Sequence, residues 1–188
     1  MVEIVPYQSY WPIDFQRIAT ILRSGLGSLA LRIDHIGSTS VPGLAAKDVI
    51  DLQITVAALD QRFLSAMTAI GYSQPEGIWR DHRPPQTEGP DTEWEKWYFD
   101  PPLNQRRTHT HVRVQGRSNQ RYALLFRDYL RAHPATAAAY AELKRRLAHN
   151  LADARTYPDV KDPAVDLIFL AAEEWATAIH WRMGPSDA

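Results

Sequence analysis

Residues 35–54 read HIGSTSVPGLAAKDVIDLQI, and they contain the turn and the strand around which the rest of the sequence can be arranged. The small-residue turn Gly37-Ser38-Thr39-Ser40 follows an apolar segment. Residues 49–56 alternate in polarity, which is typical of a β-strand with an apolar and a polar face. Asp51 lies on the polar face with Gln53 and Thr55. An ionised carboxylate inside a strand is costly unless it is paired or bound to a metal, so either this face is wet or it points into a site.

The periodicity of the remaining sequence predicts an α+β fold. The expected helices span residues 11–24, 60–70, 119–132, 134–151 and 163–182, and the other expected strands span residues 29–36, 94–100 and 108–115. Asp162 followed by Pro163 is typical of a helix start. Residues 73–92 are rich in Pro, Gly and polar residues, which indicates a long loop. We expect an antiparallel or mixed sheet with helices on one side, followed by C-terminal helices.

Composition limits the classes of protein to which the chain can belong. It has 188 residues, a formal net charge of −1 and no cysteine. The length predicts a single domain over 1–188. The order of the expected elements divides it into a core of about 4–116 and a helical part of about 117–183. The charge gives no strong nucleic-acid signal and no attraction to anionic lipid. No apolar run reaches the roughly 18 residues that span a bilayer, so we expect a cytoplasmic protein with no membrane partner.

Several side chains could form a site with Asp51. His109 and His111 are two residues apart on an expected strand and therefore share a face. Such a pair could hold a metal, act as a base or bind phosphate, but solvent-facing histidines on an edge strand are a common alternative. Lys47, Lys144 and Arg127 could contact a phosphate, although such residues are more often solvated.

The Gly37–Ser40 turn also has two interpretations. Successive backbone N–H groups and three hydroxyls could form a nest for an anion. The turn could equally be a polar connection between two elements. It is not a P-loop, because no Gly-Lys-Ser/Thr sequence follows it.

The stretch HIGSTSVPGLAAKDVID resembles the signature of the GrpB family. The segments YQSYWPIDFQRI, THTHV, LLFRDYLRAHP and YAELKRRLA occur in the same order in that family, and the resemblance covers roughly residues 4–150. The family is similar to the nucleotidyltransferase superfamily, whose catalytic fold is polymerase-β-like. Similar domains are fused to the C-terminus of some dephospho-CoA kinases.

The resemblance implies a site for a nucleotide or another phosphate-bearing ligand. In the superfamily a Gly-Ser turn holds the triphosphate, and two acids on the next strand hold a divalent metal. Gly37 and Ser38 match the turn and Asp51 matches the first acid, whereas Gln53 stands in place of the second. The implied catalytic and metal-binding set is Asp51, His109 and His111, with Mg²⁺ or Mn²⁺ preferred to Zn²⁺. The expected phosphate-binding set is Gly37, Ser38, Thr39, Ser40, Lys47, Arg127 and Lys144.

Three functions are compatible with these features. The first is a nucleotidyltransferase that uses a divalent metal, and the second is a non-catalytic binding or accessory module related to CoA metabolism. The third is a hydrolase with a His-bound metal. The glutamine at position 53 favours the binding module, because a neutral amide replaces a carboxylate that Mg²⁺ would need.

Overall fold

The structure is a computed structural model that describes residues 2–77, 79–85 and 87–188. A four-stranded sheet lies at its centre, in the order β1 (Arg32–Ile36), β2 (Ile50–Val56), β4 (Thr108–Val114) and β3 (Trp97–Phe99). The β1–β2 and β4–β3 pairs are antiparallel, and the β2–β4 pair is parallel. The sheet is therefore mixed, as the sequence predicts.

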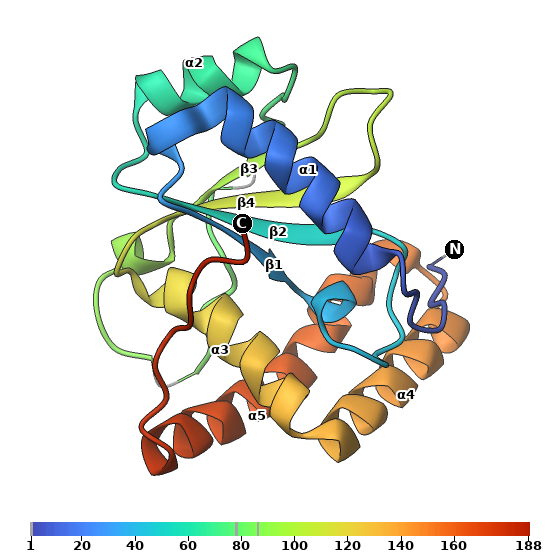
Figure 1. Ribbon diagram of the computed structural model, residues 1–188. Coiled ribbons are helices and arrows are strands. Elements are labelled where there is room, and N and C mark those ends of the chain that lie inside the picture. Colours follow the sequence, from blue (N-terminus) through green and yellow to red (C-terminus); the bar gives the residue numbers. More distant parts are fainter. Residues whose placement is uncertain (1, 78, 86) are drawn as a thin grey trace.

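Helices cover both faces of this sheet. Figure 1 shows α1 (Trp11–Leu26) and α2 (Gln61–Ala69) on one face, with α3 (Ser118–Ala132), α4 (Pro134–Asn150) and α5 (Tyr157–Ala178) on the other. The expectation that helices lie on one side only is wrong. Both faces need a cover, because the apolar face of β2 requires α1 and α2 while the polar face is closed over by the three C-terminal helices.

The apolar face of the sheet forms the larger hydrophobic core. Ile50, Leu52 and Ile54 of β2 are fully buried there, together with Trp11 and Phe15 of α1. Removing a side chain of this size from water stabilises the fold by about 1.5–3 kcal/mol. The predicted alternation of β2 is thus confirmed, and it fixes which face of the sheet remains for polar residues.

Strand register gathers the polar residues on the opposite face. In the parallel β2–β4 pair, Asp51 lies beside His109, Gln53 beside His111, and Thr55 beside Arg113. Side chains at every second position of a strand share a face. Neighbouring strands are about 4.8 Å apart, so the two series form adjacent rows under α3, α4 and α5.

The beginning of α5 differs from the prediction. The helix starts at Tyr157 with Pro158 in its first turn, and Pro163 lies inside it. Pro158 has no N–H to leave unpaired at a helix start, so the first proline provides the start signal that the sequence interpretation assigned to the second. An internal proline loses one helical hydrogen bond and is tolerated here on a helix packed against α3 and α4.

The other predicted helices and strands are confirmed within a few residues at each end. In the part of the chain that the structure describes, no helix is both long enough and apolar enough to cross a membrane.

Candidate functional site

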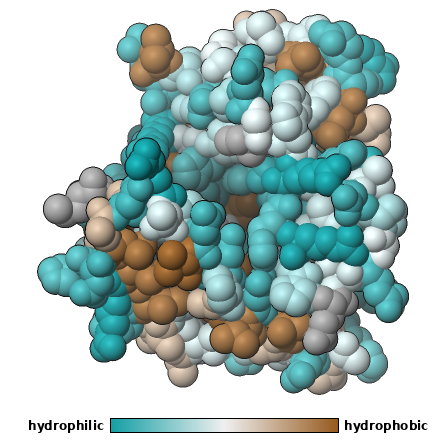
Figure 2. Space-filling view, turned by 180° about the vertical axis from the view of Figure 1, so that it is seen from behind, coloured by the Kyte–Doolittle hydropathy of each residue, from teal (hydrophilic) through white to brown (hydrophobic). Residues whose placement is uncertain are grey.

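A cavity of about 440 Å³ opens on the polar side of the sheet. Residues of β1, β2 and β4 form its floor, and α3, α4 and α5 supply aromatic and basic side chains. In the space-filling view, a hollow near the middle of the molecule is surrounded by hydrophilic residues (Figure 2). A cavity of this size can enclose a small organic ligand.

The lining of the cavity carries an excess of positive charge. By formal charge, with histidine neutral, five cationic side chains outnumber three carboxylates by two. The cationic side chains are Lys47, Lys96, Arg113, Lys144 and Lys161, and the carboxylates are Asp51, Asp81 and Asp162. The whole chain has a formal net charge of −1. The positive charge is therefore a local feature of this cavity and would attract an anion.

Asp51 and His109 form a pair on the cavity floor. The Nδ1 atom of His109 lies 2.8 Å from Oδ1 of Asp51. Adjacent parallel strands present the two residues in register, and both side chains are partly exposed to the cavity. The structure thus places these two predicted site residues together.

Gln53 belongs to a buried ion-pair network. Its Oε1 atom accepts a hydrogen bond of 2.6 Å from Nη1 of Arg113. Two other nitrogens of the same guanidinium donate to the carboxylate of Asp81, at 2.7 and 2.8 Å. Lys96 and Asn119 also donate to Asp81, at 2.7 and 3.1 Å. Burial would raise the pKa of Asp81, but Arg113 and Lys96 outweigh it and hold the pKa well below its usual range.

His111 lies against this network and not against Asp51. Its Nδ1 atom is 3.2 Å from the Lys96 amine. Burial, and then the charges of Lys96 and Arg113, lower the pKa of His111 well below its usual value. The imidazole is therefore neutral at pH 7 and accepts a hydrogen bond from the lysine.

These contacts test whether the predicted metal set fits its purpose. A divalent ion such as Mg²⁺ needs several oxygen ligands around it. Here one carboxylate, Asp51, is present, while the amide oxygen of Gln53 and the ring of His111 each face a cation. Within the described residues, no three His, Asp or Glu side chains are arranged to hold a metal. The set does not fit a divalent ion, and we assign no chemical step to one.

The predicted phosphate turn lies at the edge of the cavity and approaches Asp51 closely. Gly37 has φ +66°, and a Cβ atom there would lie 2.5 Å from a carboxylate oxygen of Asp51. Only glycine adopts this backbone conformation without strain and leaves room for the acid. Gly37 and Ser38 line the cavity. The turn and Asp51, which are close in the sequence, are therefore also in close contact in the fold.

Lys144 reaches this turn from α4. Its Nζ atom donates to Oγ of Ser38 at 2.8 Å and to the carbonyl of Ala45 at 2.5 Å. The residue is 3% exposed, and both acceptors are neutral. Burial, and then the charge of Lys161, lower the pKa of Lys144 to about 7.

Lys47 lies on the same side of the cavity. Its amine is 4.2 Å from the centre of the Tyr157 ring. Burial, and then the charge of Lys161, also lower the pKa of Lys47. The cavity thus contains two lysine amines whose charged forms are destabilised by their surroundings.

Three residues of the predicted phosphate set point elsewhere. Thr39 is buried and its hydroxyl lies 3.0 Å from Nε2 of His35. The hydroxyl of Ser40 donates to the carbonyl of Gly37. Arg127 is bonded to Asp128, Asp187 and the carbonyl of His35. None of the three lines the cavity, and each instead makes polar contacts within the protein.

Sequence reasoning missed Asp81, Lys96 and Lys161. Asp81 comes from the predicted loop 73–92, and Lys96 precedes β3. A buried loop carboxylate has no periodic pattern that would reveal it. The single available signal was Arg113, an arginine on the same predicted strand face as His109 and His111, which needs an anionic partner if that face is enclosed.

Comparison with known proteins places the chain in a family. The family model described as GrpB protein matches residues 1–170. The chain belongs to the GrpB family. The UPF0157 protein BH1888 of Halalkalibacterium halodurans is 35% identical over 91% of this chain and 82% of its own length. The crystal structure of GrpB from Enterococcus faecalis superimposes with a TM-score of 0.74 and 29% identity, covering 92% of this chain and 99% of that one.

Other relatives are longer proteins. The dephospho-CoA kinase of Mycolicibacterium paratuberculosis is 36% identical over 96% of this chain, and the chain spans 48% of that protein. The GrpB-family chain therefore covers about half the length of the dephospho-CoA kinases that it matches. Cid1, solved with its product ApU, aligns over 74% of this chain and 42% of its own, with 14% identity and a TM-score of 0.49.

Proposed function

We propose that this GrpB-family chain binds a small phosphate-bearing ligand in the cavity, without a divalent metal. The observation that carries the proposal is Lys144, a buried amine beside the Gly37-Ser38 turn. Among the described residues, its hydrogen bonds go to two neutral oxygens. A buried cation without a counter-charge is unfavourable. A phosphate oxygen would supply that charge and would form a strong, charge-assisted hydrogen bond.

The surroundings of Lys144 favour phosphate among the possible anions. The turn offers the Ser38 hydroxyl and a glycine backbone that a ligand can approach. Lys47 and Lys161 also line the cavity, so several charges can share the oxygens of one phosphoryl group. A lysine amine binds phosphate as a compact point charge.

The remainder of the cavity suits a ligand with an apolar or aromatic portion. Its lining includes four aromatic rings, namely those of Tyr122, Phe126, Tyr140 and Tyr157. Aromatic side chains provide large, rigid contact areas for planar groups. A nucleotide or a CoA-related compound has both parts, and the names of the longer relatives make a CoA precursor the first compound to test.

Binding is favoured over metal-dependent nucleotidyl transfer. That reaction uses carboxylates to hold divalent ions at the phosphates. In this chain the amide oxygen of Gln53 accepts a hydrogen bond from Arg113, and the ring of His111 accepts one from Lys96. The same contacts disfavour a hydrolase with a metal on His109 and His111.

A thermal-shift experiment tests the proposal. The chain is heated in EDTA with inorganic phosphate, pyrophosphate, ATP, dephospho-CoA or CoA, and again with Mg²⁺ in place of EDTA. We expect at least one phosphate compound to raise Tm in EDTA, because a ligand that binds only the folded state stabilises it.

Lys144→Met is the informative variant, and Arg146→Met is its matched control. Arg146 lies on the same helix with its side chain 74% exposed and paired with Glu142. We expect the Tm increase to vanish in Lys144→Met and to persist in Arg146→Met. A ligand that stabilises both variants equally would contradict the proposed site, and stabilisation that needs Mg²⁺ would contradict the metal-free mode.

A further inference from the structure

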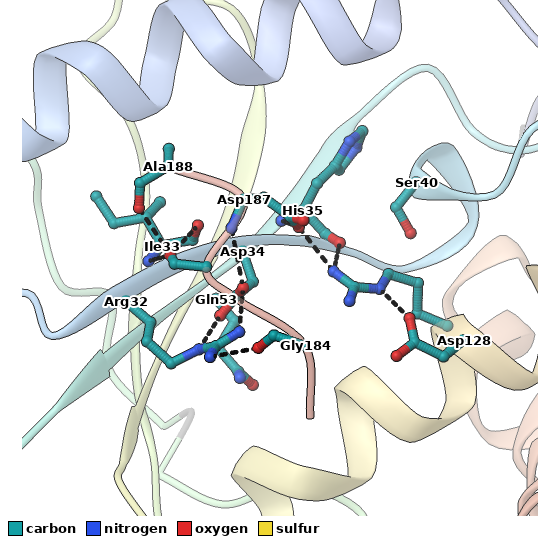
Figure 3. Close-up of polar contacts among 12 residues, drawn as sticks. Arg32, Ile33, Asp34, His35, Ser40, Gln53, Asp128, Gly184, Asp187 and Ala188 are labelled. Carbon is teal, nitrogen blue, oxygen red and sulfur yellow. Dashed lines mark hydrogen bonds and ion pairs between the residues drawn. The ribbon is translucent and has the colours of Figure 1, made fainter. Parts of the chain in front are cut away.

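The outer edge of β1 is covered by residues 184–188 in an extended conformation. Strand β1 lies at one end of the sheet, and its partner β2 occupies one side only. Figure 1 shows the C-terminal segment beside β1, and Figure 3 shows Asp187 and Ala188 next to Ile33 and His35. An exposed strand edge presents unpaired N–H and C=O groups to other chains.

Side chains of the segment satisfy those groups. The backbone N–H of Ile33 donates to Oγ of Ser186 at 3.0 Å, and the N–H of His35 donates to Oδ2 of Asp187 at 2.9 Å. The backbone N–H of Ala188 donates to the carbonyl of Ile33 at 3.1 Å. Ser186 and Asp187 thus accept hydrogen bonds from the amides of β1, as a neighbouring strand would.

Arg32 and Arg127 also hold residues 184–188 in place. Arg32 donates to the carbonyls of Gly184 and Pro185 at 2.8 and 3.0 Å. Nη1 of Arg127 donates to Oδ2 of Asp187 at 2.7 Å and to the carbonyl of His35 at 3.0 Å. The side chain of Arg127 is 5% exposed and that of Asp187 is 27% exposed, so this ion pair is largely shielded from water.

Few apolar contacts hold the segment in place. Ala188 is its one member that packs against the main hydrophobic core. Gly184 and Pro185 are exposed, and residues 181–188 have no regular secondary structure. A segment held by polar contacts at the surface opens with a smaller free energy than the core does.

From these contacts we infer that the outer edge of β1, with Arg32 and Arg127, is a binding site for an extended peptide that contains a Ser-Asp pair. The chain's own residues 184–188 fill the site, and a peptide of the same sequence can replace them. This is strand-edge recognition, in which backbone hydrogen bonds give affinity and side-chain contacts give specificity. The inference is independent of any ligand in the cavity.

A truncated chain tests the inference directly. A chain that ends at Met183 is titrated with a peptide of residues 183–188, and binding is followed by calorimetry. We expect one peptide to bind per chain. An Asp187→Ala peptide is expected to bind at least about tenfold more weakly, because it cannot form the shielded ion pair with Arg127. The complete chain should bind the peptide more weakly than the truncated chain, because its site is already filled.

Two chain variants serve as a matched pair in the truncated background. Arg32→Met removes the contacts to Gly184 and Pro185, together with the ion pair to the buried Asp34, and should weaken peptide binding. Arg62→Met is the control, because that side chain is 80% exposed and its polar contacts within the described residues are with Asp60. Equal affinity in the two variants, or no peptide binding to a folded truncated chain, would overturn the inference.

Hydrogen exchange in the complete chain gives a second test that does not depend on the truncated chain folding. In Asp187→Ala, the amide of His35 should exchange at least about tenfold faster than in the unaltered chain, since its acceptor is lost. The amide of Ile54 in the central strand should not change. An equally protected His35 amide in Asp187→Ala would overturn the inference.

Discussion

The affinity of the cavity for an anion is predicted to fall steeply above pH 7, because Lys144 loses its proton there. The pKa of Lys144 is lowered to about 7 by burial, then by the charge of Lys161. A bound anion favours the charged amine and returns the pKa toward its ordinary value. Binding is therefore linked to the uptake of one proton, and higher pH opposes it.

The magnitude follows from the fraction of protein that is ready to bind. With a free pKa of about 7, roughly half of the Lys144 amines are protonated at pH 7 and about 1% at pH 9, so the apparent affinity should drop about fiftyfold. In this range neutral histidines contribute little. The other groups that act on Lys144 are the charges of Asp51, Lys161 and Arg145 and the nearby ring of Tyr140.

The assay is a calorimetric titration with sulfate, whose charge is constant over this range, at fixed ionic strength and in EDTA. Lys144→Met is the control, and its weaker affinity should vary little with pH because the titrating amine is absent. A wild-type affinity that is the same at pH 7 and pH 9 would show that the charge of Lys144 does not control anion binding. So would a fiftyfold decline that persists in Lys144→Met.

Three further outcomes concern stability. Without ligand, the free energy of unfolding of the wild type should rise with pH relative to that of Lys144→Met, by about 1.4 kcal/mol per pH unit between pH 7 and 10. The reason is that the unfolded lysine keeps the proton that the folded one has lost. Urea melts at several pH values measure this difference. Gly37→Ala should cost roughly 1–3 kcal/mol more than Gly43→Ala, since both glycines have positive φ and only the first would meet neighbouring atoms; equal costs would show that the turn does not need close approach. Asp81→Asn should destabilise by about 3–5 kcal/mol in urea melts by leaving buried cations unpaired, whereas Asp91→Asn, in a 63% exposed side chain, should cost less than about 1 kcal/mol; similar losses would argue against a buried network.

Periodicity predicted the parts of the fold that follow from local rules. Residues 49–56 form β2 with the expected faces, because strand geometry alone places alternate side chains on opposite sides. Trp11, Phe15 and Ile18 bury the expected face of α1 for the same kind of reason. The pairing of β2 with β4 did not follow from either strand, since strand order depends on long-range packing.

The sequence predicted which residues lie together in the cavity only where those residues are also close along the chain. The Gly37 turn and Asp51 lie close in sequence, and a short connection keeps them together. Asp81 could not be predicted, because its burial depends on Arg113 and Lys96 from separate segments. Arg127 has the residue type expected for phosphate binding, but its partner, Asp187, lies 60 residues away.

The start of α5 shows a different limit. Two prolines, Pro158 and Pro163, each follow a residue that can begin a helix. Local preference alone cannot show which proline marks the helix start. A proline inside a helix costs about 3 kcal/mol, but packing against other helices can offset that cost. In the structure α5 begins at the earlier proline and packs against α3 and α4.

A calorimetric titration of pyrophosphate in EDTA at pH 7, into the wild type and into Lys144→Met, tests whether the cavity contains a phosphate site. Pyrophosphate isolates the phosphate-binding end of the cavity from its aromatic part. We predict one site per chain in the wild type, with an affinity at least about tenfold higher than in Lys144→Met, the loss expected for one charged hydrogen bond. Absence of binding to the wild type, or equal binding to both proteins, would contradict the claim that Lys144 and the Gly37-Ser38 turn form a phosphate site.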